Sequence, residues 1–510
     1  MTGTNSAEAY AFLKKRFANI EKLVNSSSIL GKDAETAMAK GSGEDRVNQM
    51  IAIGSAIHDW IADTKVKDAL DLAESDAGAF TSEDRRNLAL MRKKWIHEAG
   101  LPSKLADEVA RLEAEGQQRH VQNYKSGDWN TMRDWYAHSF AIMREVGETT
   151  MSALGVDSPY AALIDRFSPG IHPDDVAREF AALDAVLQRL IPEALEKQKS
   201  EPAPLELAGP FGDTEQMLLG QEMAKKVGFD VTRGVLYSIK GHPSLGGSSD
   251  DCRITTRISE NDFLPGLYGT IHETGHAVYQ QGLPKEWRYQ PVGGPLGMDV
   301  HESQSMIMEL QAGMSREFLI HLSERLQDIF NRHGDPAFDA ENLRRLMWRA
   351  NPSFIRVDAD ELTYSMHVLL RHDLESRIIG GQLDARDLPD AWNDGMKKRL
   401  GIAPENPSQG CMQDVHWPCG AVGYFPAYTL GAMGAAQFNA AARKARPEIP
   451  AELAKGNFGP LKEWLNANVH SKGSLVTSKD LFIQATGEPL NAKPYLNHLS
   501  QRYIGKLFAP

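Results

Sequence analysis

The chain has 510 residues, of which 42% are hydrophobic, so it is long enough to bury a large core. Its 68 acidic residues outnumber its 56 basic residues, and the net charge of −12 argues against nucleic acid as the main partner. No apolar run reaches the length of a membrane span, and the first residues show no apolar segment typical of a secretory signal. Three cysteines are too few for a disulfide framework, which fits a reducing cytoplasm.

The first 200 residues predict a succession of amphipathic helices, because apolar residues recur at helical spacing between breaks that contain glycine or proline. The clearest helical segments are 7–24, 45–64 and 174–195, and the breaks lie at 41–43, 100–102 and 168–170. We expect one domain over 1–510. Within it, a helical lobe of about 1–200 precedes a catalytic part of about 213–435.

Two short segments rich in β-forming residues follow, Gly234–Ile239 and Cys252–Ile258, with a glycine-rich stretch between them. They predict a small antiparallel hairpin or sheet. Its edge could hold an extended peptide by strand addition, or the hairpin could be purely structural.

The next stretch, 268–283, predicts a helix that ends at Gly282, and it contains an HExxH pattern. Because residues four apart share one face of a helix, the imidazoles of His272 and His276 can point at one metal ion. Glu273 is placed to accept a proton from water at that metal. Gly275 weakens the helix, which indicates that another segment packs closely against it.

A catalytic zinc site usually has a third protein ligand. The variant with a third histidine six residues after the second is excluded, because Gly282 occupies that position. A second helix is expected through Met314, with Asp299 as its N-cap. On that helix we prefer Glu302 as the third ligand, and its rivals are His301 and Glu309.

Two further regions combine charged and aromatic residues in expected loops, where functional sites tend to lie. The first is 355–361, which precedes a helix that ends at Ile379. The second comprises 410–417 and 423–428.

Five motifs in this order resemble those of the carboxypeptidase Taq family of metallopeptidases. The motifs are Asp251-x-Arg253-x-Thr255, His272-Glu273-Thr274-Gly275-His276, His301-Glu302-Ser303-Gln304, Ile355-Arg356-x-x-Ala359-Asp360 and Gly410-x-x-Gln413-Asp414-x-His416-Trp417. The family usually has His-Pro-Phe where this chain has His242-Pro243-Ser244, which leaves the role of the aromatic ring open.

The resemblance implies a mainly α, two-lobed helical metallopeptidase fold with a deep active-site groove, the small sheet lying beside it, and usually a homodimer. It implies removal of single residues from free peptide C-termini with broad specificity. By the same resemblance His272, His276 and Glu302 bind one Zn2+ per chain, for which Co2+ can substitute, and Glu273 is the general base.

Hydrolysis of a peptide also needs hydrogen-bond donors for the oxyanion, and His416 and Tyr424 are our candidates. A carboxypeptidase must bind a free carboxylate, a task that suits arginine. Arg356 is the leading candidate for this role and Arg253 the second. Arg356 could instead form a structural ion pair with Asp358 or Asp360.

Two other functions remain open at this stage. A metallo-oligopeptidase would use the same metal chemistry to cut internal bonds and would not require a free C-terminus. A helical scaffold or metal-binding protein without enzymatic activity would keep its function when Glu273 is replaced by glutamine.

Overall fold

The computed structural model describes residues 5–508 and is mainly helical, as the sequence predicts. None of the helices in this range is both long enough and apolar enough to cross a membrane. The helices of the first 200 residues are α1 (Ser6–Thr36), α2 (Gly43–Ala62), α3 (Thr64–Glu74), α4 (Ser82–Ala99), α5 (Ser103–Asn123), α6 (Arg133–Leu154), α7 (Pro159–Asp165) and α8 (Pro173–Lys199). The predicted breaks at 100–102 and 168–170 fall between helices, and the break at 41–43 overlaps α2 by one residue, Gly43.

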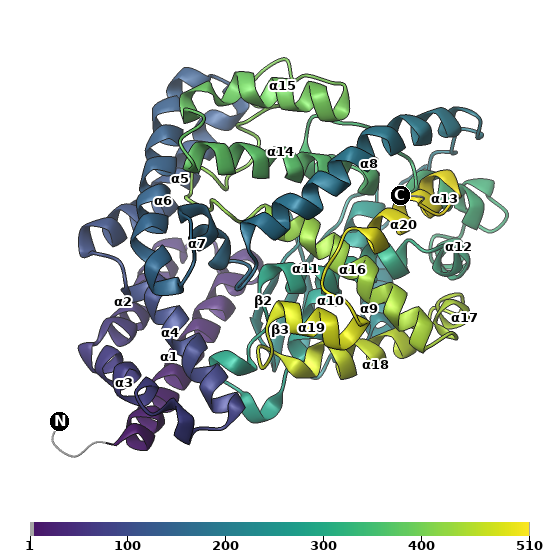
Figure 1. The fold of residues 1–510 in the computed structure, drawn as a ribbon. Helices are drawn as coiled ribbons and strands as arrows, with labels where there is room; N and C mark the ends of the chain where they lie inside the picture. The colour runs from purple at the N-terminus through teal and green to yellow at the C-terminus, as the bar shows by residue number, and fades with distance from the viewer. Residues whose placement is uncertain (1–4, 509–510) are drawn as a thin grey trace.

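In Figure 1 the remaining helices lie mainly to the right of α1–α6, with α14 and α15 towards the top. They are α9 (Asp213–Val227), α10 (Leu264–Gly282), α11 (Met298–Met306), α12 (Arg316–Ile329), α13 (Ala340–Met347), α14 (Glu361–Ile379), α15 (Leu388–Leu400), α16 (Pro426–Ala445), α17 (Ile449–Leu453), α18 (Gly459–Asn468), α19 (Ser478–Thr486) and α20 (Lys493–Ile504). The ends of α10 and α14 confirm the predicted helix stops at Gly282 and Ile379.

The hydrophobic core is divided unequally between the early and later helices. Apolar side chains of α1, α3 and α4, among them Leu13, Phe17 and Leu70, form a cluster of their own. Those of α5–α8 join the large core that they share with the rest of the chain. The lobe boundary near residue 200 and the deep groove therefore stay predictions.

The small sheet has three strands, β1 (Gly234–Ile239), β2 (Leu245–Ser248) and β3 (Asp251–Arg257), in the order β1-β3-β2. The antiparallel prediction is correct for β2 and β3 but wrong for β1 and β3, which run parallel. The reason is that the glycine-rich stretch supplies a strand of its own. Because β2 runs back between them in sequence, β1 and β3 share one direction.

The sheet packs on α10 through β3, whose Cys252 and Ile254 are buried against Ala277. Helix α11 packs against α10 and continues into the π-helix η6 (Ile307–Gly313). The predicted N-cap at Asp299 is wrong: α11 begins after Gly297, and the Asp299 carboxylate accepts a hydrogen bond from Ser478 instead.

Two glycines allow the central helices to approach closely. A Cβ atom on Gly275 of α10 would lie 2.4 Å from the carbonyl oxygen of Gln304, which confirms the predicted close packing at this residue. A Cβ atom on Gly431 of α16 would lie 2.6 Å from Cβ of Glu302. The backbones of α10, α11 and α16 are therefore held against one another around the residues of the HExxH pattern.

Candidate metal centre

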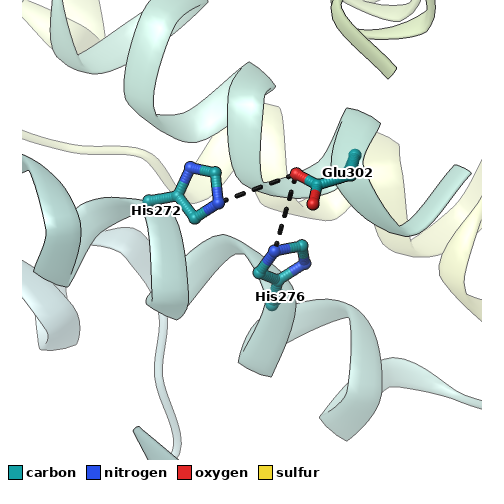
Figure 2. A group of neighbouring side chains, drawn as sticks. All are labelled: His272, His276 and Glu302. Carbon is teal, nitrogen blue, oxygen red and sulfur yellow. Dashed lines mark ion pairs between the residues drawn. The ribbon is translucent and has the colours of Figure 1, made fainter. Parts of the chain in front are cut away.

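Three of the predicted site residues meet where α10 crosses α11. Figure 2 shows the imidazoles of His272 and His276, on successive turns of α10, turned toward the Glu302 carboxylate on α11. The Nε2 atoms of the two histidines lie 3.7 and 3.8 Å from Oε2 of Glu302. The candidate ligand atoms of the three residues all lie within 4.8 Å of one another.

Glu309 and His301, the two other candidates for the third ligand, contact the histidines at their Nδ1 atoms. Oε2 of Glu309, on η6, accepts a hydrogen bond from Nδ1 of His272 at 2.7 Å. Nδ1 of His301 lies 2.6 Å from Nδ1 of His276, so one of these two nitrogens carries the hydrogen. Both contacts use Nδ1, which leaves each Nε2 facing Glu302. This is the arrangement by which outer partners orient metal-binding histidines.

The electrostatics of the cluster favour a bound cation. Burial raises the pKa of Glu302 and lowers that of His276 well below its usual range, so this imidazole is neutral. Burial also lowers the pKa of His272, but the hydrogen bond and charge of Glu309 outweigh it and raise the value to about 10. Three acidic side chains, those of Glu273, Glu302 and Glu309, thus lie around the two histidine rings in a largely buried space.

The donor set fits a divalent transition metal. Two imidazole nitrogens and one carboxylate oxygen are the ligand types of many catalytic zinc sites. The side chain of Glu302 is fixed by a hydrogen bond from Ser305, 3.2 Å from Oε2. Burial raises the pKa of Glu273 to about 7, which places a proton acceptor of near-neutral pKa beside the three donors.

Arg356 lies at a second buried cluster, and its partner is neither of the predicted aspartates. Its Nε and Nη2 donate to Oδ1 of Asp414 at 3.1 and 2.9 Å, and Nη1 donates to the Tyr364 hydroxyl at 2.8 Å. Arg371 donates to the other oxygen of Asp414 from Nε at 2.7 Å. Asp360 instead caps α14, accepting from the backbone at the start of that helix.

Two guanidinium groups thus share one carboxylate, and all three side chains are at most 8% exposed. The two arginines are positively charged and Asp414 supplies a single negative charge, so the cluster has one uncompensated positive charge. Burial raises the pKa of Asp414, but the charges of Arg371 and Arg356 outweigh burial and hold that pKa well below its usual range, so Asp414 is ionised. Burial lowers the pKa of Arg371, yet both arginines stay charged beside the ionised carboxylate.

His416 and Tyr424 lie beside this cluster. The His416 ring packs 4.5 Å from Phe425 and 5.4 Å from Tyr424, centroid to centroid. Burial lowers the pKa of His416 to about 4, so it is neutral at physiological pH, and its buried Nδ1 has no hydrogen-bond partner within residues 5–508. Burial and then the charge of Glu302 raise the pKa of Tyr424, which therefore keeps its hydroxyl hydrogen.

The structure does not bring Arg253 into contact with the metal-site residues. On β3 its Nε and Nη2 donate to the Asp251 carboxylate at 3.1 and 3.0 Å, and the side chain is 22% exposed.

Sequence reasoning missed several residues of the site. Arg371, which is buried, and Tyr364, which is partly buried, lie on α14 in the cluster of Arg356, yet the sequence assigned them no role. Asp414 stood within a quoted motif, but its partnership with two arginines was not predicted. The available signal was the presence of Tyr364 and Arg371 on a largely buried helix, α14, which follows the Arg356 motif.

Comparisons with known proteins place the whole chain in one family. The family model described as carboxypeptidase Taq (M32) metallopeptidase matches residues 12–503. Thermostable carboxypeptidase 1 of Thermus thermophilus is 33% identical over 491 residues, covering 94% of this chain and 95% of the relative. Carboxypeptidase 1 of Bacillus subtilis is 28% identical, covering 96% of both chains.

Solved structures agree as well. Metallocarboxypeptidase 1 of Trypanosoma cruzi matches with a TM-score of 0.94 at 34% identity, covering 97% of this chain and 99% of that one. The M32 carboxypeptidase of Deinococcus radiodurans matches with a TM-score of 0.90 at 30% identity, covering 97% and 98%. The resemblance predicted from five motifs is confirmed.

Proposed function

The chain belongs to the carboxypeptidase Taq (M32) family and is a metal-dependent carboxypeptidase, and from this premise we propose how its residues act. The enzyme releases single residues from the free C-termini of peptides with broad specificity. The observation that carries this proposal is the buried Arg356–Asp414–Arg371 cluster with its surplus positive charge, which a substrate carboxylate would balance.

His272, His276 and Glu302 would hold one zinc ion per chain, and cobalt would substitute for it because it accepts the same donors. When bound, the metal supplies Lewis-acid chemistry, lowering the pKa of water and polarising a carbonyl group. Glu309 and His301 would fix the two imidazoles through Nδ1.

Glu273 is the proposed general base. Its carboxylate would accept a proton from the attacking water and later deliver it to the leaving amine nitrogen. Its pKa of about 7, raised by burial, suits both transfers near neutral pH. The isosteric Glu273→Gln change removes the proton acceptor and preserves the shape of the side chain.

Two neutral donors would stabilise the oxyanion. His416 is uncharged and can donate from one ring nitrogen, and Tyr424 keeps its hydroxyl hydrogen. Such donors act strongly in a site with little water, because they are oriented before the charge develops.

Arg356 is the proposed anchor for the C-terminal carboxylate. Of its five N–H groups, the contacts found in the described part of the chain, with Asp414 and Tyr364, use three, so two could bind a substrate. Arg253 is the second candidate for this role.

We further propose that the enzyme acts in the cytoplasm as a homodimer. All three cysteines are free, which fits a reducing compartment. Its partners would be peptides with a free C-terminus, and with a net charge of −12 it would not bind nucleic acid or depend on a membrane.

The test follows peptide products by mass spectrometry, using the zinc-loaded protein and a peptide with either a free or an amidated C-terminus. Stepwise loss of single C-terminal residues is expected for the free peptide alone. Glu273→Gln should abolish it, whereas Glu324→Gln, an exposed glutamate of α12, should not. Internal cuts that ignore amidation would instead identify a metallo-oligopeptidase.

A second measurement separates the two arginines. Arg356→Met should raise KM for free peptides much more than Arg253→Met does. The opposite order would assign carboxylate binding to Arg253.

A further inference from the structure

The Glu375 carboxylate, on α14, is a buried acidic group that the proposed mechanism does not use. The side chain is fully enclosed and accepts hydrogen bonds from Nε1 of Trp417 at 2.7 Å, the Tyr160 hydroxyl at 2.9 Å and the backbone N–H of Gly423 at 3.2 Å. Burying a carboxylate costs free energy unless such donors surround it. Three donors from two separate parts of the chain therefore hold this group in one place.

Two of the three donors lie next to the residues proposed to stabilise the oxyanion. Trp417 follows His416 in sequence, and Gly423 precedes Tyr424. The His416 and Tyr424 rings lie 5.4 Å apart, centroid to centroid, so the two ends of this loop come together. Glu375 is thus attached to the loop beside both of the proposed donors.

The two attachments use different oxygens of the same carboxylate. Trp417 donates to Oε1, whereas Gly423 and the Tyr160 hydroxyl donate to Oε2. A glutamine side chain has one acceptor oxygen and one NH2 group, which only donates. In either orientation, that NH2 group would face the N–H of Trp417 or that of Gly423. An acceptor at both positions is therefore needed to hold both ends of the loop.

Close packing on two other helices limits how far the loop can move. Gly423 has a φ of 89°, and a Cβ atom there would lie 2.8 Å from the carbonyl carbon of Leu163, on α7. At the other end, the Ser139 hydroxyl of α6 donates to the backbone oxygen of Trp417 at 2.6 Å. A change at Glu375 is therefore expected to displace the ends of the loop slightly and not to release it.

We propose that Glu375 is a positioning residue of the hydrolytic reaction, which holds His416 and Tyr424 where they can donate to the oxyanion. This inference rests on the donor roles proposed above for these two residues. It adds to the machinery a buried carboxylate whose hydrogen bonds, in the described part of the chain, involve neither the candidate metal ligands nor Arg356.

The first experiment measures kcat and KM of Glu375→Gln with a free peptide. We expect kcat to fall by about tenfold to 100-fold, because a small misplacement of oriented donors is costly. KM should stay within about twofold of the wild-type value, because the oxyanion forms only in the transition state. Asp373→Asn, on the same helix with a side chain 41% exposed, should leave both constants unchanged.

A second comparison asks whether Glu375 acts through the two donors. In a protein that carries both His416→Phe and Tyr424→Phe, adding Glu375→Gln should change kcat by less than about twofold, because the groups that Glu375 positions are absent. Retention of the full loss from Glu375→Gln in this background would overturn the inference. An unchanged kcat in Glu375→Gln alone would overturn it as well.

Two measurements without turnover separate positioning from a general structural role. Hydrogen exchange in residues 416–424 should be faster in Glu375→Gln, because the loop loses one of its attachments. Zinc affinity, measured by competition with a chelator, should stay within about twofold of the wild-type value, because Glu375 orients none of the candidate ligands. A loss of zinc affinity as large as the loss of kcat would place the effect at the metal centre and overturn the inference.

The outcomes also distinguish this inference from the proposed function. If the wild-type protein shortens no peptide, or if His416→Phe and Tyr424→Phe keep the wild-type kcat, the proposed function of these residues fails, and hydrogen exchange still decides whether Glu375 fixes the loop. An unimpaired Glu375→Gln beside impaired donor variants would contradict only the role of Glu375. If Glu375→Gln does not fold, Trp417→Phe decides, because it removes one attachment and should lower kcat without raising KM.

Discussion

Glu309 offers a sharp test of how this metal centre is built, because its side chain makes a hydrogen bond to His272 and is not itself one of the three candidate ligands. Its Oε2 accepts a hydrogen bond from Nδ1 at 2.7 Å, and both side chains are about four-fifths buried. The contact fixes the ring so that Nε2 faces Glu302. Removing such a partner typically lowers metal affinity by about 10- to 100-fold, or roughly 1.4–2.8 kcal/mol.

Two variants divide this effect into its parts. Glu309→Gln keeps an acceptor oxygen and loses the charge, so we expect the smaller loss of zinc affinity, about tenfold. Glu309→Leu removes the acceptor as well and leaves the imidazole free to rotate, so the loss should approach about 100-fold. Glu317→Gln, on the neighbouring α12 and outside the metal cluster, serves as the control.

The assay is competition for zinc against a chelator of known affinity, with circular dichroism to confirm that each variant is folded. Zinc affinity in Glu309→Leu that stays within twofold of the Glu317→Gln control would refute the reasoning. It would mean that the packing of α10 against α11 alone orients His272.

Two further predictions concern stability. Gly275→Ala should lower the free energy of unfolding by about 1–3 kcal/mol and weaken zinc binding, because its Cβ would meet the backbone of α11. Gly54→Ala in α2, where nothing lies within 4 Å, should instead be neutral or stabilising, and equal effects in denaturant titrations would contradict this. Burial raises the pKa of Glu375 to about 7, so its protonated form stabilises the fold below about pH 4.5, and this contribution is lost as pH rises through about 7. Relative to the wild type, Glu375→Gln should therefore gain up to roughly 3 kcal/mol between these values, and a difference independent of pH would exclude this explanation.

Much of this protein could be predicted from local patterns in the sequence. The end of α10 at Gly282 and the end of α14 at Ile379 follow from apolar periodicity and glycine, which act within a few residues. The juxtaposition of His272 and His276 follows from helix geometry alone. The order of five motifs was enough to identify the family.

The features that the sequence left open depend on contacts between distant segments. Whether β1 pairs with β3 in parallel depended on which stretch supplied the intervening strand. The partner of Arg356 proved to be Asp414 because tertiary packing brings η8 (Arg356–Asp358) against the later loop, whereas sequence proximity had suggested nearer aspartates.

The same limit explains the roles of the two rival ligands. Spacing along α11 and η6 could not tell whether Glu309 and His301 face the metal position or the back of the histidines. That depended on how closely α10 approaches α11, which Gly275 permits. Sequence periodicity determines which residues share a face of one helix, and only tertiary packing determines which face of another element they meet.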